Sequence, residues 1–131
     1  MRKDINFHTA EKVQIVAIRE WDKDFLAQHW NIYVVNNSTM LLETILVMSR
    51  GISENKKTTT LRRNLGNLIP ESSIKIEFIT DAVLEFTNEY LVTYFSEDKL
   101  YEKVFTFLPH SISEKNSTKI PVIHSEGVIA S

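Results

Sequence analysis

Hydrophobic and charged residues alternate along short stretches of this chain, and the clearest stretch is Ser73–Ile79. Large apolar side chains at every second position alternate there with Lys75 and Glu77. A period of two places successive side chains on opposite faces of a β-strand. We therefore expect a strand over these residues, with one apolar face toward a core and one charged face toward solvent.

Several other stretches are rich in β-branched and aromatic residues and are bounded by turn residues. The clearest of them are Lys12–Glu20, Trp30–Val35, Glu43–Ser49, Glu89–Phe95 and Tyr101–Leu108. Weaker candidates are Thr58–Arg63, as a short edge strand, and Ile120–Ile129, as a final edge strand. Because the strands do not alternate with long helical patterns, the sequence predicts an all-β fold, an antiparallel β-sandwich of about seven strands.

The remaining segments are expected to connect these strands within one domain. A chain of 131 residues fits a single domain spanning residues 1–131, with mobile ends. Thr80–Phe86 is either a loop or one helical turn capped by Asp81. The segment 110–119 is polar, and we expect a mobile loop there.

Composition bears on the cellular compartment. Cysteine is absent, which favours a reducing environment over a disulfide-dependent secreted one. No stretch near the N-terminus has the apolar length of a signal-peptide core, and none reaches the roughly 20 apolar residues that a membrane helix needs. We therefore expect a cytoplasmic protein that makes no membrane contact.

The net charge of −2 conceals an uneven distribution of charge along the chain. Residues 50–63 hold five basic residues against one acidic residue, whereas residues 71–102 hold eight acidic residues against two basic ones. Such asymmetry is compatible with electrostatic steering or self-association, but in a small domain two separately solvated edges are the favoured interpretation.

One basic group is a candidate for phosphate contacts, and its members are Lys56, Lys57, Arg62 and Arg63. Lysine and arginine neutralise phosphates, and Tyr33 or Tyr94 would be available to stack on bases. The group lacks the interleaved aromatic residues of RNA-binding strands. A charged edge strand that resists pairing with other chains is therefore the favoured interpretation, and we do not expect nucleic acid as a partner.

No motif for catalysis or metal binding stands out. The histidines are too far apart in sequence to form a recognisable zinc motif. They are His8, His29, His110 and His124. Glu85 and Glu89 are four residues apart, but their spacing has no geometric meaning if a loop and a strand carry them. We therefore expect no catalytic residue, no metal ligand and no cofactor.

Parts of the chain resemble immunoglobulin-like bacterial modules. The likeness lies in Trp30–Asn37, where a strand ends in asparagine, in the following strand Leu42–Val47, and in the Pro70–Ser73 turn that leads into Ile74–Phe78. The whole chain also resembles a set of short uncharacterised bacterial proteins. The matching stretches are Trp30–Asn36, Leu42–Gly51, Lys57–Arg63, Lys75–Glu77, Asn88–Tyr94, Tyr101–Leu108, Ile120-Pro121 and Gly127-Val128.

Proteins of that set are often labelled phenylalanyl-tRNA synthetase alpha subunit. A synthetase catalytic domain of that class needs a far longer chain and a glycine-rich stretch that ends in arginine to hold ATP. The glycines of this chain, Gly51, Gly66 and Gly127, are isolated. The resemblance therefore supports the fold and implies no functional residue, and we expect no synthetase activity.

These observations favour a non-enzymatic β-sandwich module that acts by protein–protein interaction or self-association. A second hypothesis is a sandwich that binds a small ligand or a carbohydrate, which the tyrosines together with Trp21 and Trp30 suggest. We expect both tryptophans to anchor the core, wholly or in part. A third hypothesis is weak nucleic-acid binding through the basic segment 56–63.

Overall fold

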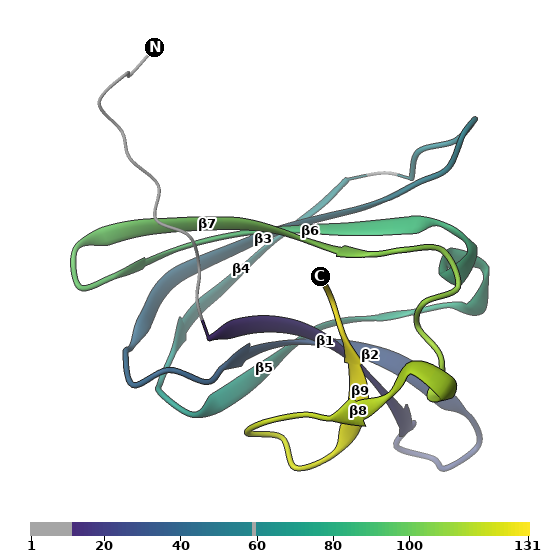
Figure 1. The fold of residues 1–131 in the computed structure, drawn as a ribbon, viewed down its shortest axis with the longest axis horizontal. Helices are drawn as coiled ribbons and strands as arrows, with labels where there is room; N and C mark the ends of the chain where they lie inside the picture. Colours follow the sequence, from purple (N-terminus) through teal and green to yellow (C-terminus); the bar gives the residue numbers. More distant parts are fainter. Residues whose placement is uncertain (1–11, 59) are drawn as a thin grey trace.

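The computed structural model describes residues 12–58 and 60–131, whose strands form two antiparallel sheets packed face to face (Figure 1). This arrangement confirms the predicted all-β sandwich. It contains nine strands rather than about seven, because the C-terminal part of the chain contributes two short strands.

One sheet has five strands in the order β5-β2-β1-β9-β8. Their bounds are Ser72–Ile79, Gln28–Asn36, Val13–Trp21, Glu126–Ile129 and Thr118–Lys119. The other sheet has four strands in the order β4-β3-β6-β7. Their bounds are Leu61–Leu68, Leu42–Ile52, Thr87–Ser96 and Lys99–Phe107. Two 3-10 helices, η1 (Asp81–Glu85) and η2 (Glu114–Asn116), connect strands.

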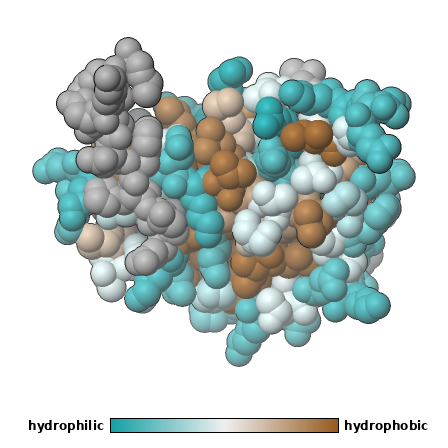
Figure 2. All heavy atoms as spheres, turned by 45° about the horizontal axis from the view of Figure 1, so that its top comes forward, coloured by the Kyte–Doolittle hydropathy of each residue, from teal (hydrophilic) through white to brown (hydrophobic). Residues whose placement is uncertain are grey.

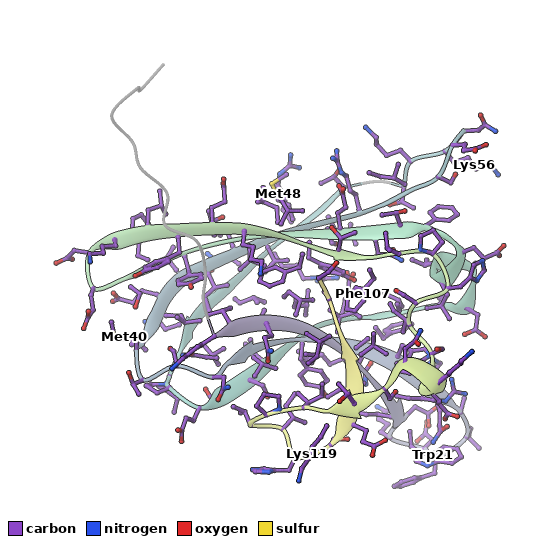
Figure 3. All side chains as sticks on the ribbon, viewed as in Figure 1. Trp21, Met40, Met48, Lys56, Phe107 and Lys119 are labelled. Carbon is purple, nitrogen blue, oxygen red and sulfur yellow. The ribbon has the colours of Figure 1, made fainter. Side chains whose placement is uncertain are left out.

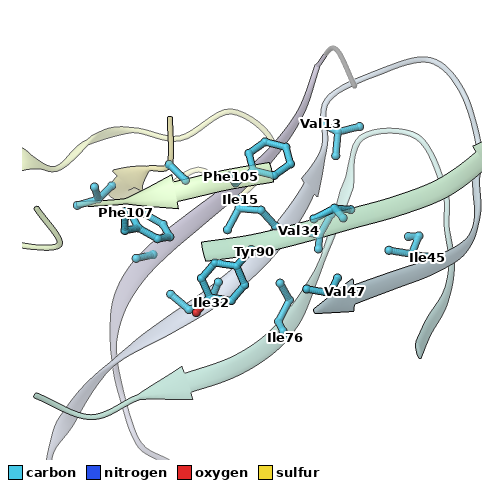
Figure 4. Close-up of a cluster of buried hydrophobic side chains, with 14 of the residues drawn as sticks. Val13, Ile15, Ile32, Val34, Ile45, Val47, Ile76, Tyr90, Phe105 and Phe107 are labelled. Atoms are coloured by element: carbon cyan, nitrogen blue, oxygen red, sulfur yellow. The ribbon is translucent and has the colours of Figure 1, made fainter. Parts of the chain in front are cut away.

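The core lies between the sheets and is built from the inward positions of both. Ile15, Ile32 and Val34 of the five-stranded sheet share one buried cluster with Tyr90 and Phe107 of the four-stranded sheet (Figure 4). Burying each such aliphatic side chain contributes about 1.5–3 kcal/mol to folding. The alternation of apolar residues in the sequence therefore supplies most of the force that closes the sandwich.

A two-residue turn joins β6 to β7. Both of its central residues, Glu97 and Asp98, have positive φ values, of 49° and 65°. Two successive positive φ values define a type I′ turn, whose twist matches that of the strands it connects. The turn fixes the register in which Ser96 pairs with Lys99.

The segment after β7 covers part of the outer face of the five-stranded sheet. Ile120 is fully buried and forms a second apolar cluster with Val16, Ile18 and Val35, which point away from the main core. This covering explains why both faces of β1 are apolar. No helix in the described part of the chain is long and apolar enough to cross a membrane.

Two strand predictions are corrected. The strand predicted over Thr58–Arg63 begins and ends later, as β4 at Leu61–Leu68. The stretch Ile120–Ile129 is not one strand: the chain turns within it, and only Glu126–Ile129 forms β9. A β-strand at an edge tolerates the turn-like residues of β4, because only one of its edges is paired.

The connecting segments also differ in detail from the expectations. Thr80–Phe86 holds the helical turn η1, but Thr80 is its N-cap residue and no side chain caps it, so the expected role of Asp81 is wrong. Within 110–119, η2 forms and Ile112 is buried in the core. The segment is therefore anchored at one apolar side chain, and its mobility stays a prediction.

Candidate functional site

Several apolar side chains point outward from the four-stranded sheet, and five of them define a surface on β3, β6 and β7. We call them the apolar face, and they are Leu46, Met48, Leu91, Phe95 and Val104. Met48 pairs with Leu91, and Leu91 pairs with Val104, so one apolar row crosses β3, β6 and β7. Figure 2 shows hydrophobic side chains gathered on this side of the molecule, and Figure 3 shows Met48 pointing away from the core.

The apolar face is substantially exposed among the described residues. Leu46 and Phe95 are each 44% exposed, and Val104 is 50% exposed. An antiparallel sheet whose outer face meets water normally carries polar residues at these positions. The opposite outer face of the sandwich is covered in part by the chain's own C-terminal segment, whereas no described segment covers this one. An exposed apolar patch of this kind makes the outer side of the four-stranded sheet a candidate interaction surface.

Opposite charges lie at the two ends of the same sheet. Lys56 and Lys57 are exposed at the tip of the β3–β4 hairpin, and Glu97 and Asp98 are exposed in the β6–β7 turn. The strand register places these two turns at opposite ends of the sheet, as Figure 1 shows. The apolar face is therefore flanked by a basic end and an acidic end.

The predicted basic patch does not form one surface. Arg62 and Arg63 are neighbours on β4, so their side chains leave opposite faces of the sheet. Arg62 lies beside Met48 in the register, whereas Arg63 forms an ion pair with Glu77 on β5, with 3.8 Å between Nη2 and Oε1. The structure separates Arg63 from the lysines, which weakens the geometric case for a phosphate-binding site.

A second site lies at the side of the sandwich where the edge strands β4 and β5 face each other. A cavity of about 320 Å³ opens there, with Glu77 and Tyr90 in its lining. The Tyr90 hydroxyl donates a hydrogen bond to Oε2 of Glu77, at 2.9 Å. The side chain of Glu77 is only 12% exposed, although alternation in the sequence predicts it to face solvent.

A β-bulge explains why that prediction for Glu77 is wrong. Ile32 of β2 pairs with Glu77 and Tyr33 pairs with Lys75, so Ile76 is an extra residue in β5. A bulge changes which side chains face inward, and such features occur next to functional sites. The bulge lets both Ile76 and Glu77 point toward the opposite sheet.

Tyr90 stays protonated in this environment over the ordinary pH range. Burial is the main cause that raises the pKa of the Tyr90 hydroxyl well above its usual range, and the negative charge of Glu77 adds to it. Nearby Arg63 opposes the shift. The hydroxyl is therefore a fixed hydrogen-bond donor to Glu77 rather than an acid.

This burial predicts a loss of stability at high pH. In the unfolded chain Tyr90 ionises near pH 10, whereas in the folded state it stays protonated. Because the folded pKa is the higher one, the contribution to stability is complete below about pH 10 and declines by about 1.4 kcal/mol per pH unit above it. Urea denaturation at pH 9, 10 and 11 measures the decline, which Tyr90→Phe should reduce. Equal slopes for the two proteins would contradict the assignment to Tyr90.

A third hollow, of about 370 Å³, lies on the outer side of the five-stranded sheet. Trp21 contributes to the wall of this hollow and is 54% exposed, so the prediction that it anchors the core is wrong. Trp30 is buried, as predicted. Beside the hollow, Oε1 of Glu20 accepts hydrogen bonds from the Asn31 amide and the Tyr33 hydroxyl, at 2.7 and 2.6 Å.

The tyrosines considered for base stacking are held in place. Tyr33 bonds Glu20, and Tyr94 is buried with its ring stacked on Tyr101, 5.1 Å between centroids. Burial, with a smaller effect from Tyr101, raises the pKa of Tyr94 to about 12. Tyr94 is therefore part of the core.

The histidines and the pair Glu85 and Glu89, considered above as candidate site residues, form no common site in the described part of the chain. His8 lies outside the described residues, and His29 packs against Phe78 with 5.4 Å between ring centroids. Glu89 forms an ion pair with Arg50, at 3.0 Å, whereas Glu85 is exposed on η1. No group of three or more metal-ligating side chains occurs within residues 12–58 and 60–131.

Comparison with known proteins identified no relative of this chain. No protein-family model, curated protein or solved structure matches this chain.

Neither the apolar face nor the cavity was predicted from the sequence. The apolar face has a signal in the sequence, because apolar residues occupy both alternating sets in two neighbouring strands, as in the run from Ile45 to Met48. The cavity has no such signal, because it depends on the bulge in β5.

Proposed function

We propose that the protein is a non-enzymatic, cytoplasmic β-sandwich module that associates with a second copy of itself through the apolar face. The observation that carries the proposal is the apolar row of Met48, Leu91 and Val104 across three neighbouring strands, which no segment within residues 12–58 and 60–131 covers. Removing such a row from water is favourable by about 25 cal/mol for each Å² buried.

The order of the strands supports an immunoglobulin-like fold as part of the proposal. In such sandwiches the first, second and fifth strands are neighbours in one sheet, and the third, sixth and seventh are neighbours in the other. The orders β5-β2-β1 and β3-β6-β7 agree with that arrangement. Here β4 pairs with β3, and β8 and β9 extend the five-stranded sheet. The resemblance to short uncharacterised bacterial proteins stays a prediction.

Charge favours a second copy as the partner. A two-fold axis that runs across the strands, in the plane of the contact, would place the β3–β4 tip of one copy over the β6–β7 turn of the other. Lys56 and Lys57 would then lie near Glu97 and Asp98 of the second copy, twice in one dimer. Such a self-complementary arrangement is what a symmetric interface requires.

The size of the sheet sets the expected strength of the contact. Four strands about 4.8 Å apart, each about eight residues long, cover roughly 500 Å² in projection. Specific interfaces bury about 800 Å² on each partner, so this one belongs to the weak, transient class. We expect a dissociation constant on the order of 10–100 μM.

The test replaces one side chain of the apolar face by lysine. Leu46→Lys places a charge in the centre of the contact, and we expect it to raise the dimer dissociation constant at least about tenfold. Sedimentation equilibrium from about 5 to 500 μM measures the constant. Val104→Lys provides a second variant, and Thr118→Lys, on the exposed strand β8, is a control that adds the same charge elsewhere.

Either outcome can be interpreted, because the replaced side chains are exposed and their substitution should not unfold the protein. The variants should keep the unfolding free energy of the wild type to within about 0.5 kcal/mol. A wild-type protein that stays monomeric at about 500 μM contradicts the proposal. Equal dimerisation by wild type and Leu46→Lys contradicts the assignment to this face.

A further inference from the structure

The two sides of the sandwich are closed differently. On one side, the backbone N–H and C=O groups of Thr106 and Ser131 exchange two hydrogen bonds, of 2.9 and 3.0 Å, which join β7 to the end of the chain. On the other side, the edge strands β4 and β5 are bridged by Arg63 and Glu77. The cavity of about 320 Å³ opens on this second side.

Glu77 is the acidic group of that cavity, and the protein satisfies it only in part. Oε2 accepts one hydrogen bond from Tyr90, and Oε1 is 3.8 Å from Nη2 of Arg63, which is beyond hydrogen-bond distance. A carboxylate has about four lone-pair sites. The remaining lone-pair sites of this carboxylate, whose side chain is 12% exposed, are available to water or to a further donor that enters the cavity.

The other charged group of the lining is already paired. Arg50 bonds Glu89, with 3.0 Å between Nε and Oε1. Leu61, Ile79 and Val83 supply apolar wall, and the cavity has the volume of about ten water molecules. The site therefore combines one carboxylate, held only by Tyr90 and by the long contact to Arg63, with a largely apolar space for about ten non-hydrogen atoms.

Gly51 lies in the wall of the cavity, where the backbone of β3 packs closely against neighbouring side chains. A Cβ atom at this position would lie 2.8 Å from the ring of Phe86 and 3.1 Å from the Thr58 methyl group. The backbone of β3 can approach these side chains only without a side chain of its own. The packing of this wall therefore requires glycine at position 51.

We propose that this cavity binds a small organic cation, an ammonium or guanidinium group on a short apolar body, with Glu77 as its anchor. Tyr90 holds the carboxylate in position by its hydrogen bond. The side chain of Arg63 is 45% exposed and its contact is long, so the incoming cation displaces it. The inference does not depend on self-association, because the cavity opens at the side of the sandwich between β4 and β5, whereas the apolar face lies on the outer side of the four-stranded sheet.

The experiment titrates the protein with three ligands of one shape and different charge: benzylammonium, benzyl alcohol and benzoate. Two-dimensional NMR follows the backbone signals of residues 77–80, 88 and 90. We expect saturable binding of benzylammonium and at least about tenfold weaker binding of benzyl alcohol, since hydrogen bonds to a charged partner are the stronger ones. Benzoate should not bind.

Variants assign the binding to named groups. Glu77→Gln should weaken benzylammonium binding at least about tenfold, whereas Glu85→Gln, a matched change at an exposed carboxylate, should leave it unchanged. Arg63→Gln should strengthen binding, because it removes the competing cation. A merely structural role for Glu77 predicts no such gain.

Three results would overturn the proposal: no saturable binding up to about 20 mM benzylammonium, equal binding of benzyl alcohol, or unchanged binding by Glu77→Gln. The first two are read on the wild-type protein, so they hold even if the Glu77 variant does not fold. The cation could come from a lysine side chain of another protein or from a free small amine. A parallel titration with the capped peptide acetyl-Ala-Lys-Ala-amide distinguishes these sources, because the peptide should bind more tightly than benzylammonium in the first case and less tightly in the second.

Discussion

Gly127→Ala should destabilise the protein by at least about 3 kcal/mol, although it adds only one methyl group. A Cβ atom at Gly127 would lie 2.5 Å from the backbone oxygen of Ala17 and 3.0 Å from Cγ1 of Ile18. The backbone oxygen belongs to β1, which is paired with β2 on its other side, so it has little freedom to move. The strand β9 must therefore leave its place.

The displacement of β9 would cost more than one contact. Val128 and Ala130 are buried in the main core, and the Ala130 N–H donates to the Ile15 carbonyl at 2.9 Å. Urea denaturation measures the loss, and limited proteolysis should cut the variant after Lys119. A loss below about 1 kcal/mol would contradict the account of how β9 packs.

Gly66→Ala is the control for this prediction. Gly66 has a φ of +73°, but nothing lies within 4 Å of its added Cβ atom. Its replacement should therefore cost only the backbone penalty, about 1–2 kcal/mol. Similar losses at the two glycines would show that steric contact with β1 is not the cause.

Asn36→Ala should cost about 3 kcal/mol, since this fully buried amide ties together two turns. Its Nδ2 group donates to the carbonyl oxygens of Met40, Leu68 and Ile69 at 2.9–3.2 Å. Its Oδ1 atom accepts from the Ser38 N–H and hydroxyl. Alanine removes this donor and leaves buried carbonyl groups without a partner, each at about 1–3 kcal/mol.

Asn36→Asp separates hydrogen bonding from packing. Its carboxylate would face backbone carbonyl oxygens, which raises the pKa of the aspartate in the folded state above its unfolded value near 4. Because the folded pKa is the higher one, the variant should be least destabilised below about pH 4 and increasingly destabilised as the pH rises to 7. Urea denaturation at both pH values checks this. Asn37→Ala, at an exposed neighbour, should change stability by less than about 0.5 kcal/mol. A pH-independent loss for Asn36→Asp would contradict the hydrogen-bond assignment.

The sandwich could be predicted because its inward positions are regular. Ile15 and Ala17, and likewise Val92 and Tyr94, are two residues apart and buried, as period-two alternation requires. Burial of such residues decides which face of a strand points inward, so alternation alone identifies most of the strands. The predicted bounds differ from the observed ones mainly by a residue or two at the ends.

The errors arise where the backbone leaves this regular pattern. Asn64 and Gly66 resemble turn residues but lie inside β4, because the register between β3 and β4 shifts there and Gly66 adopts a positive φ. The bulge at Ile76 turns Glu77 inward. Trp21 lies at the end of β1, beyond the covered part of the sheet, so its size did not lead to burial. Such features depend on pairing between distant strands, which local sequence patterns do not encode.

The most direct test of the central claim, that the apolar face binds a second copy, is a dilution series followed by NMR. Backbone signals recorded from about 500 μM down to 10 μM should shift for Leu46, Leu91, Phe95 and Val104, with smaller shifts at the β3–β4 tip and the β6–β7 turn. Signals of β8 and β9 should stay unchanged. Spectra that do not depend on concentration, or shifts confined to the five-stranded sheet, would contradict the account.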